Sequence, residues 1–204
     1  PPRSTLFPYT TLFRSIWNIF ARDYQNKAVF RRLEAEYGLT WEIWAGFMNA
    51  IVGIESHWDP SATSHAKARG LMQVIRGTWN RVVRSINNGR IPAGWDYDSA
   101  AYDKAKSAVV GSAYFAMILE NMLDKYAGRS GIDLEFLLKV TAAGYNSGEG
   151  RSADWYIEVQ KKGSRLALSK TFSETHNYIH NMWRRVTGKP YSAPEIGPYY
   201  AALD

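Results

Sequence analysis

The sequence predicts an all-α globular domain, and three observations support this fold class. From residue 16 onward, apolar residues recur at helical spacing, and no segment shows the alternation of apolar and polar residues that is typical of a strand. Capping residues and glycines stand at the expected starts and ends of the helical segments. Hydrophobic residues make up 46% and aromatic residues 14% of the 204 residues, which is enough to form a core.

The first half of the domain is expected to contain two or three helices. One or two of them should lie between Ile16 and Gly38, with Gly38 as a left-handed C-terminal cap. Thr40 is placed to cap the next helix, which should end near Trp58 because Pro60 disfavours helical backbone at the preceding residue. The buried face of that helix is predicted to consist of Ile43, Phe47, Ala50, Ile51 and Ile54.

The second half of the domain is expected to contain five helices. Their predicted ranges are 78–88, 103–126, 133–141, 152–162 and 173–187. Thr78, Asp103 and Asp133 precede three of these segments and are the expected N-caps. Residues 88–98 contain two glycines and a proline and are interpreted as a loop. The prediction is therefore a domain of seven or eight helices over residues 16–188, followed by an irregular tail at 189–204.

Residues 1–15 differ in character from the rest of the chain. They contain the near-duplicate segments Thr5-Leu6-Phe7 and Thr11-Leu12-Phe13, and they lack helical periodicity. They resemble translated sequencing-adapter sequence, so we interpret them as a non-native extension. A secretory signal needs an uninterrupted apolar core, and Pro8 with its polar neighbours interrupts this one. We therefore expect no export signal within this chain.

Charge and composition narrow the classes of partner. The net charge of +6 favours anionic partners, which include nucleic acid, anionic lipid and acidic cell-wall polymer. The wide spacing of the basic residues argues against nucleic acid. The longest uncharged apolar stretch, 43–54, is too short for a transmembrane helix. Without cysteine the chain has no thiolate ligand, and His176 and His180 lack an evident third ligand. We expect no metal and no cofactor.

Glu55 is the strongest candidate for a catalytic residue. It is expected in the last turn of an apolar helix, where burial and the negative helix end both raise the pKa of a carboxyl. A carboxyl that stays protonated near neutral pH can act as a general acid. Glu174 is expected in the first turn of a helix capped by Ser173, where negative charge is favoured. Placement alone leaves open that each glutamate is merely a helix-end residue.

Four separated motifs include these two glutamates. They are Glu55-Ser56 with the Asp59-Pro60 break, Ser64 with Gly70-Leu71-Met72-Gln73, Ala143-Gly144-Tyr145-Asn146, and Glu174-Thr175 through Tyr178. In this order they resemble the soluble lytic transglycosylase family, and the resemblance extends from about residue 40 to residue 187. It implies the goose-type lysozyme fold, an α-helical muramidase fold.

The resemblance also implies a role for each matched position. Glu55 takes the position of the catalytic acid. The other matched positions are expected to bind substrate: Ser56, Ser64, Met72, Gln73, Tyr145, Asn146, Glu174 and Tyr178. Among them, Met72 is expected in the wall of the sugar groove, and Glu174 and Tyr178 are expected to close the site from the last helix.

The activity implied by the resemblance is cleavage of the β-1,4 bond between N-acetylmuramic acid and N-acetylglucosamine in peptidoglycan glycan strands. Glu55 would protonate the leaving oxygen and then accept the proton of the 6-hydroxyl that attacks C1, which forms a 1,6-anhydro ring. Such an enzyme would act in the cell envelope, periplasmic or extracellular, and we expect a monomer. Two alternatives remain open: a goose-type lysozyme that uses water, and a non-catalytic peptidoglycan-binding or secretion-scaffold module.

Two departures from the family pattern bear on the site. Lys67 stands where the family commonly has glycine, so a positive φ at this position would be strained. Asp59 replaces the more common asparagine and could be mistaken for a second catalytic carboxylate. We interpret Asp59 as a turn residue before Pro60.

Overall fold

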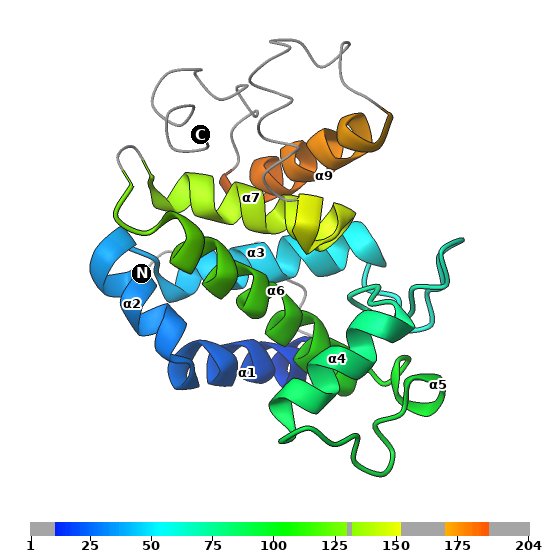
Figure 1. Cartoon of the computed structure of the whole chain (residues 1–204). Helices are drawn as coiled ribbons and strands as arrows, with labels where there is room; N and C mark the ends of the chain where they lie inside the picture. Colours follow the sequence, from blue (N-terminus) through cyan, green and yellow to red (C-terminus); the bar gives the residue numbers. More distant parts are fainter. Residues whose placement is uncertain (1–10, 130–131, 152–169, 188–204) are drawn as a thin grey trace.

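Helices make up the regular structure of the chain (Figure 1). The computed structural model describes residues 11–129, 132–151 and 170–187. Its elements are α1 (Thr11–Asn26), α2 (Ala28–Tyr37), α3 (Trp41–Glu55), α4 (Arg76–Ile86), α5 (Tyr97–Ala100), α6 (Lys104–Tyr126), α7 (Leu134–Ser147), the 3-10 helix η1 (Glu149–Arg151) and α9 (Lys170–Thr187). In these residues β-structure is limited to isolated bridges that join Arg69 to Thr63 and to Val74. The predicted all-α class is confirmed.

Helix α6 lies at the centre of the domain, because it packs against α1, α4 and α7 (Figure 1). Phe115 in its middle is fully buried, and its ring lies 5.8 Å from that of Trp44 and 6.4 Å from that of Phe47, both on α3. Helices α3 and α7 each pack against α9. The end of α3 and the end of α7 are thereby held on opposite sides of one pocket.

The predicted N-caps of α3, α6 and α7 are confirmed. Thr40, Asp103 and Asp133 each accept a hydrogen bond from the backbone N–H three residues further along the chain. These bonds satisfy N–H groups that have no partner inside the helix. Gly38 ends α2 in the left-handed conformation, with φ of 70°. Local sequence therefore determines where α3, α6 and α7 begin.

Two helices begin earlier than predicted. α4 begins at Arg76 rather than at Thr78, because the carbonyl of Ile75 accepts the first helical hydrogen bond from the N–H of Trp79 at 2.8 Å. Thr78 therefore lies within the first turn and is not the cap. α9 begins at Lys170 rather than at Ser173. This places Glu174 in the second turn, where the favourable interaction of a carboxylate with the helix N-terminus is weaker.

Helix α1 begins at Thr11, so the expected lack of helix before Ile16 is wrong for residues 11–15. No proline or glycine lies between Thr11 and Ile16, so this segment contains no residue that breaks a helix. The interpretation of residues 1–15 as a non-native extension stays a prediction. The helix expected at 152–162 and the tail expected at 189–204 lie outside the described residues.

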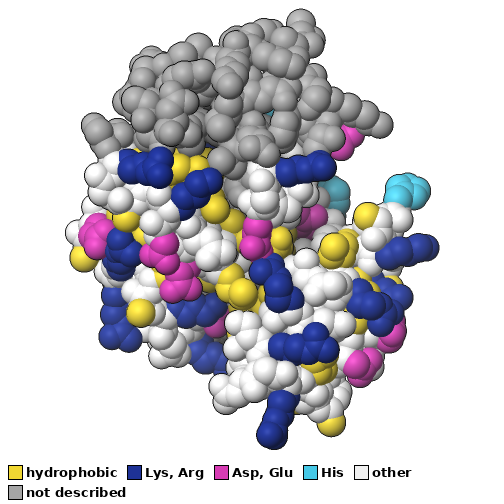
Figure 2. All heavy atoms as spheres, in the orientation of Figure 1, with side chains coloured by type: hydrophobic (Ala, Val, Ile, Leu, Met, Phe, Trp, Pro, Cys, Tyr) yellow, Lys and Arg dark blue, Asp and Glu magenta, His cyan; other side chains and the backbone are white. Residues whose placement is uncertain are grey.

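The visible surface carries basic and acidic side chains side by side. Figure 2 shows Lys and Arg scattered over this face and mixed with Asp and Glu, without a single basic stripe. Where the structure describes the chain, no helix combines the length and the apolar character needed to cross a bilayer.

Candidate active site

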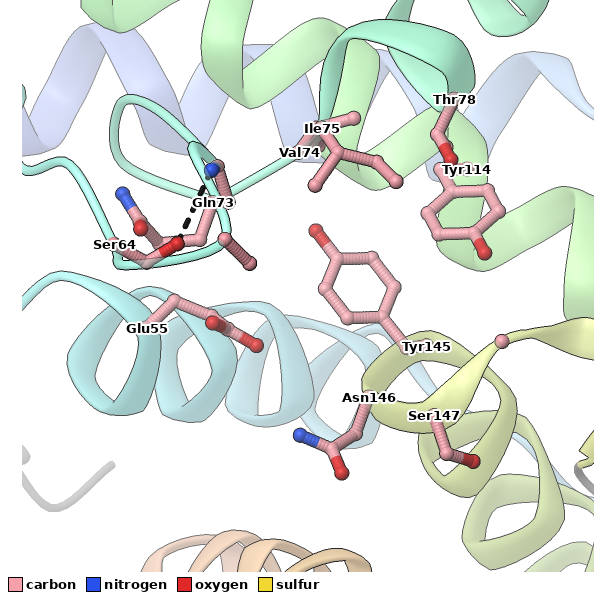
Figure 3. A pocket seen from close by; sticks show the side chains of 13 residues that line it. Glu55, Ser64, Gln73, Val74, Ile75, Thr78, Tyr114, Tyr145, Asn146 and Ser147 are labelled. Atoms are coloured by element: carbon pink, nitrogen blue, oxygen red, sulfur yellow. Dashed lines mark hydrogen bonds between the residues drawn. The ribbon is translucent and has the colours of Figure 1, made fainter. Parts of the chain in front are cut away.

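A pocket of about 520 Å³ lies between the C-terminal end of α3, the loop that precedes α4, and the C-terminal end of α7 (Figure 3). The residues that line it are Glu55, Ser64, Ala66, Ala68, Gln73, Val74, Ile75, Thr78, Tyr114, Tyr145, Asn146, Ser147 and Gly148. Of these described residues, Glu55 alone carries an ionisable carboxyl or basic group. The pocket is therefore a mixed polar and apolar cavity with one acidic group in its wall.

Glu55 is the last residue of α3, and its carboxyl extends into the pocket toward the side of Tyr145 (Figure 3). Burial raises the pKa of Glu55 from 4.5 to about 7, while the hydroxyl of Tyr178 acts in the opposite direction and lowers it. The Tyr178 hydroxyl is buried on α9 beside this carboxyl. The predicted rise in pKa is confirmed, with burial as its cause.

The chain turns sharply immediately after Glu55. The Ser56 hydroxyl donates to the carbonyl of Val52 at 3.1 Å, and His57 and Trp58 both have positive φ, 53° and 67°. Such a conformation costs about 1–2 kcal/mol for a residue with a side chain, so the surrounding structure must hold it in place. The turn ends α3 at Glu55 and keeps its carboxyl at the edge of the pocket.

Asp59 belongs to this turn. Its carboxylate accepts hydrogen bonds from the backbone N–H and the hydroxyl of Ser61, at 2.8 and 2.6 Å, and these bonds lower the pKa of Asp59. Asp59 is exposed and does not line the pocket. The interpretation of Asp59 as a turn residue is confirmed.

The loop before α4 presents Ser64 and Gln73 to the pocket. Ser64 Oγ accepts from the N–H of Ala68 at 3.1 Å, the bond marked in Figure 3, so its hydroxyl hydrogen remains available. The amide nitrogen of Gln73 donates to the carbonyls of Ala62 and Gly70, at 3.0 and 2.8 Å. With the nitrogen engaged in this way, the Gln73 amide oxygen is the atom left to accept a hydrogen bond from a ligand.

Two residues in this loop have unusual backbone conformations. Lys67 has φ of 63°, in the left-handed region, so the strain expected for a side chain at positive φ is present at Lys67. Gly70 has φ of 76°, and a Cβ at this residue would lie 2.0 Å from the carbonyl oxygen of Ala101. Only glycine can therefore bring the loop this close to the chain that follows α5.

Tyr145 reaches from α7 to the loop. Its hydroxyl donates to the carbonyl of Met72 at 2.8 Å, so a lone pair of the Tyr145 oxygen is the part left for a ligand. Burial, and then the nearby charge of Glu55, raise the pKa of Tyr145 well above its ordinary value, and the phenol stays neutral. The Met72 side chain is fully buried and approaches Gly111 so closely that a Cβ there would lie 2.4 Å from its sulfur.

Asn146 follows Tyr145 at the exposed mouth of the pocket. Its amide oxygen accepts from the hydroxyl of Thr175 on α9 at 3.0 Å. In Figure 3 the oxygen points toward α9, and the nitrogen points toward the side where Glu55 lies. The Asn146 nitrogen is therefore a donor available to a ligand.

The other end of the pocket is bounded by Tyr114 on α6. Burial and the charge of Glu149 raise the pKa of Tyr114 to about 12, while Arg81 opposes this change. Arg81 on α4 forms an ion pair with Glu149 on η1, and its guanidinium lies 5.5 Å from the centre of the Tyr114 ring. This pair connects α4 to the end of α7 beside the pocket. No cluster of three or more metal-binding side chains occurs among the described residues.

The structure brings together five of the residues singled out from the sequence: Glu55, Ser64, Gln73, Tyr145 and Asn146 line one pocket. The other four are not among the residues that line it. Ser56 is buried in the turn and Met72 is buried behind the loop, so Met72 meets the site through its carbonyl alone. Tyr178 is buried on α9 beside Glu55, and Glu174 is exposed on the same helix.

Residues 32–168 match the Transglycosylase SLT domain, which is more than half of the chain. The chain belongs to the SLT domain family. It is 27% identical over 143 residues to the soluble lytic murein transglycosylase of Escherichia coli K12, which covers 69% of this chain and 20% of that relative. It is also 27% identical over 150 residues to the membrane-bound lytic murein transglycosylase F of Cellvibrio japonicus, 71% of this chain and 26% of the relative. The chain thus spans about a fifth to a quarter of the length of these two relatives.

The SLT match covers all the described residues that line the pocket but ends before α9. Sequence reasoning missed Thr78 and Tyr114, which line the pocket, and Thr175, which holds Asn146. Thr175 lies inside the motif Glu174 to Tyr178, so its place in the sequence was a usable signal. Tyr114 lies in the middle of a long buried helix and has no local sequence feature that separates it from core residues.

Proposed function

We propose that this SLT domain is a lytic transglycosylase that cleaves the β-1,4 bond between N-acetylmuramic acid and N-acetylglucosamine in peptidoglycan. The names of the E. coli and C. japonicus relatives support this substrate. The observation that carries the proposal is Glu55, a carboxyl with pKa of about 7 in a pocket otherwise lined by neutral side chains. Such a carboxyl is protonated in a useful fraction of molecules at neutral pH and can donate its proton.

Glu55 would act first as the general acid. It transfers its proton to the glycosidic oxygen while the bond from that oxygen to C1 breaks, and positive charge develops on the sugar ring. The Tyr145 oxygen presents a lone pair because its hydrogen is bonded to Met72, and this orientation suits a developing positive charge. The Asn146 amide nitrogen and the Gln73 amide oxygen provide one donor and one acceptor for the polar groups of the sugar.

Glu55 would then act as the base. Its carboxylate accepts the proton of the 6-hydroxyl of the same sugar while that oxygen bonds to C1, so a 1,6-anhydro ring forms and no water is consumed. Most glycosidases use two carboxyl groups about 5–9 Å apart. The described lining of this pocket contains one carboxyl, which favours a mechanism in which a single group both donates and accepts the proton.

The test compares the wild-type chain with Glu55→Gln on purified peptidoglycan, by zymography and by mass spectrometry of the released fragments. We expect anhydro-muramic ends from the wild type and a rate lower by a factor of about 10²–10⁴ for the variant, the usual contribution of a general acid. Reducing muramic ends would indicate a hydrolase of the goose-type lysozyme kind. Equal clearing by both proteins, or binding of peptidoglycan with no cleavage by either, would contradict the proposal.

The proposed substrate also places the protein in the cell envelope, in the periplasm or outside the cell, because peptidoglycan occurs there. The mixed surface charges, with a net charge of +6, suit an anionic polymer of this kind.

A further inference from the structure

Thr175 lies behind the pocket and contacts one of its walls. The side chain comes from α9 and only 1% of the residue is exposed, so Thr175 does not itself line the pocket. Its hydroxyl donates to the amide oxygen of Asn146 at 3.0 Å. This bond joins the last described helix to the residue that follows Tyr145, and α9 lies outside the part of the chain that matches the SLT domain.

The bond engages the oxygen of the Asn146 amide and leaves its nitrogen for a ligand. The oxygen and nitrogen of a primary amide have nearly the same size, so the two orientations related by a 180° rotation fill the same space and differ only in hydrogen bonding. In the orientation that the structure shows, the Thr175 hydroxyl donates to the Asn146 oxygen. In that orientation the nitrogen points toward the side of the pocket where Glu55 lies (Figure 3).

We propose that Thr175 is a positioning residue, which holds the Asn146 amide so that its nitrogen donates to an acceptor oxygen of the bound sugar. An acetamido carbonyl is an acceptor of this kind. The inference rests on the proposed function, since it assigns a task in the same pocket. The Asn146 nitrogen matters as a donor because the neighbouring Gln73 and Tyr145 side chains present acceptor atoms to the pocket. The hydrogens of these two side chains are already bonded to backbone carbonyls.

The matched variants are Thr175→Val, which keeps the shape and removes the hydroxyl, and Thr175→Ser, which keeps the hydroxyl. We expect Thr175→Val to lower kcat for peptidoglycan about 10-fold, the factor for one hydrogen bond. Thr175→Ser should stay within about 3-fold of the wild type. The pH at which activity is half-maximal should stay the same in both variants, because Glu55 is unchanged. A packing role alone would change the unfolding temperature without this difference between valine and serine.

A double-mutant cycle tests whether Thr175 acts through Asn146. Because the amide is absent from Asn146→Ala, adding Thr175→Val to that variant should cause no further loss of kcat. The inference is wrong if Thr175→Val has the activity of the wild type, if serine loses as much as valine, or if the valine loss persists in full beside Asn146→Ala.

Binding of the tetrasaccharide of N-acetylglucosamine, measured by calorimetry with the same variants, separates this inference from the proposed function. Weaker binding by Thr175→Val, with binding retained by Thr175→Ser, supports the positioning role even if the wild type does not cleave peptidoglycan. Cleavage by the wild type with identical binding and kcat in all Thr175 variants overturns the positioning role alone. If the wild type neither cleaves peptidoglycan nor binds the tetrasaccharide, both are wrong.

Discussion

The carboxyl of Glu55, desolvated in the pocket, contributes to the pH dependence of stability, and Glu55→Gln should remove this contribution. The pKa of Glu55 is about 7 in the folded chain, compared with an ordinary value of 4.5. Below pH 4.5 the carboxyl is protonated in both states and its contribution to stability is fully present. As the pH rises through 7, the unfolded chain releases the proton more readily, and that contribution is lost. A difference of this size in pKa corresponds to about 3 kcal/mol.

The assay is equilibrium unfolding in urea at several pH values between 4.5 and 8. The free energy of unfolding of Glu55→Gln minus that of the wild type should increase by about 3 kcal/mol over this range. Asp59→Asn is the matched control, because hydrogen bonds from Ser61 lower the pKa of Asp59 and its contribution to stability is lost toward acid pH instead. If the difference in the free energy of unfolding between Glu55→Gln and the wild type does not change with pH, the conclusion that the carboxyl is desolvated is wrong. The proposed cleavage activity should fall as the pH rises through 7, since Glu55, the proposed general acid, loses its proton there.

Three further substitutions test the framework of the pocket. Lys67→Gly should stabilise the chain by about 0.5–1 kcal/mol, because glycine removes the cost of positive φ and adds a smaller loss of chain entropy; a lower urea midpoint would contradict this. Gly111→Ala should destabilise by about 1–3 kcal/mol in thermal unfolding, because its Cβ would overlap Met72, whereas Gly77→Ala, in a helix and with open space around it, should leave stability unchanged or slightly raised. Tyr145→Phe leaves the Met72 carbonyl without its hydrogen bond and should cost about 1–3 kcal/mol as well as lower the cleavage rate; unchanged stability would show that the bond is not formed in solution.

The parts of the fold that sequence predicted are those determined by short-range interactions. Thr40, Asp103 and Asp133 cap their helices as expected, since a side chain and an N–H three residues away are enough to make a cap. The prediction failed at Thr78 because backbone carbonyls alone begin α4 there. It failed at Ser173 because a serine inside a helix has the same sequence signature as a serine at its start.

The features of the candidate site also divide into those that local sequence predicts and those that depend on contacts between distant segments. The position of Glu55 at the end of an apolar helix was visible in the sequence, and its raised pKa follows from burial there. The burial of Met72 depends on Gly111, which is 39 positions away in the chain, and no local pattern indicates that contact. The hydrogen-bond directions of Gln73 and Asn146 likewise depend on partners on other segments. Sequence motifs therefore identified pocket residues, and the fold determined which atom each one presents.

The left-handed turn at His57 and Trp58 fixes the point at which α3 ends. The number of residues in α3 therefore determines the direction in which the carboxyl of Glu55 points. Each residue added to or removed from a helix rotates its end by about 100°. A one-residue insertion ahead of Glu55 would therefore swing its carboxyl away from Tyr145 while leaving most of the core intact. Changes in length should instead be tolerated at exposed loop positions such as Gly89, which has open space around it. Relatives that share the proposed activity should accordingly vary in their surface loops and keep the spacing between Thr40 and Glu55 constant.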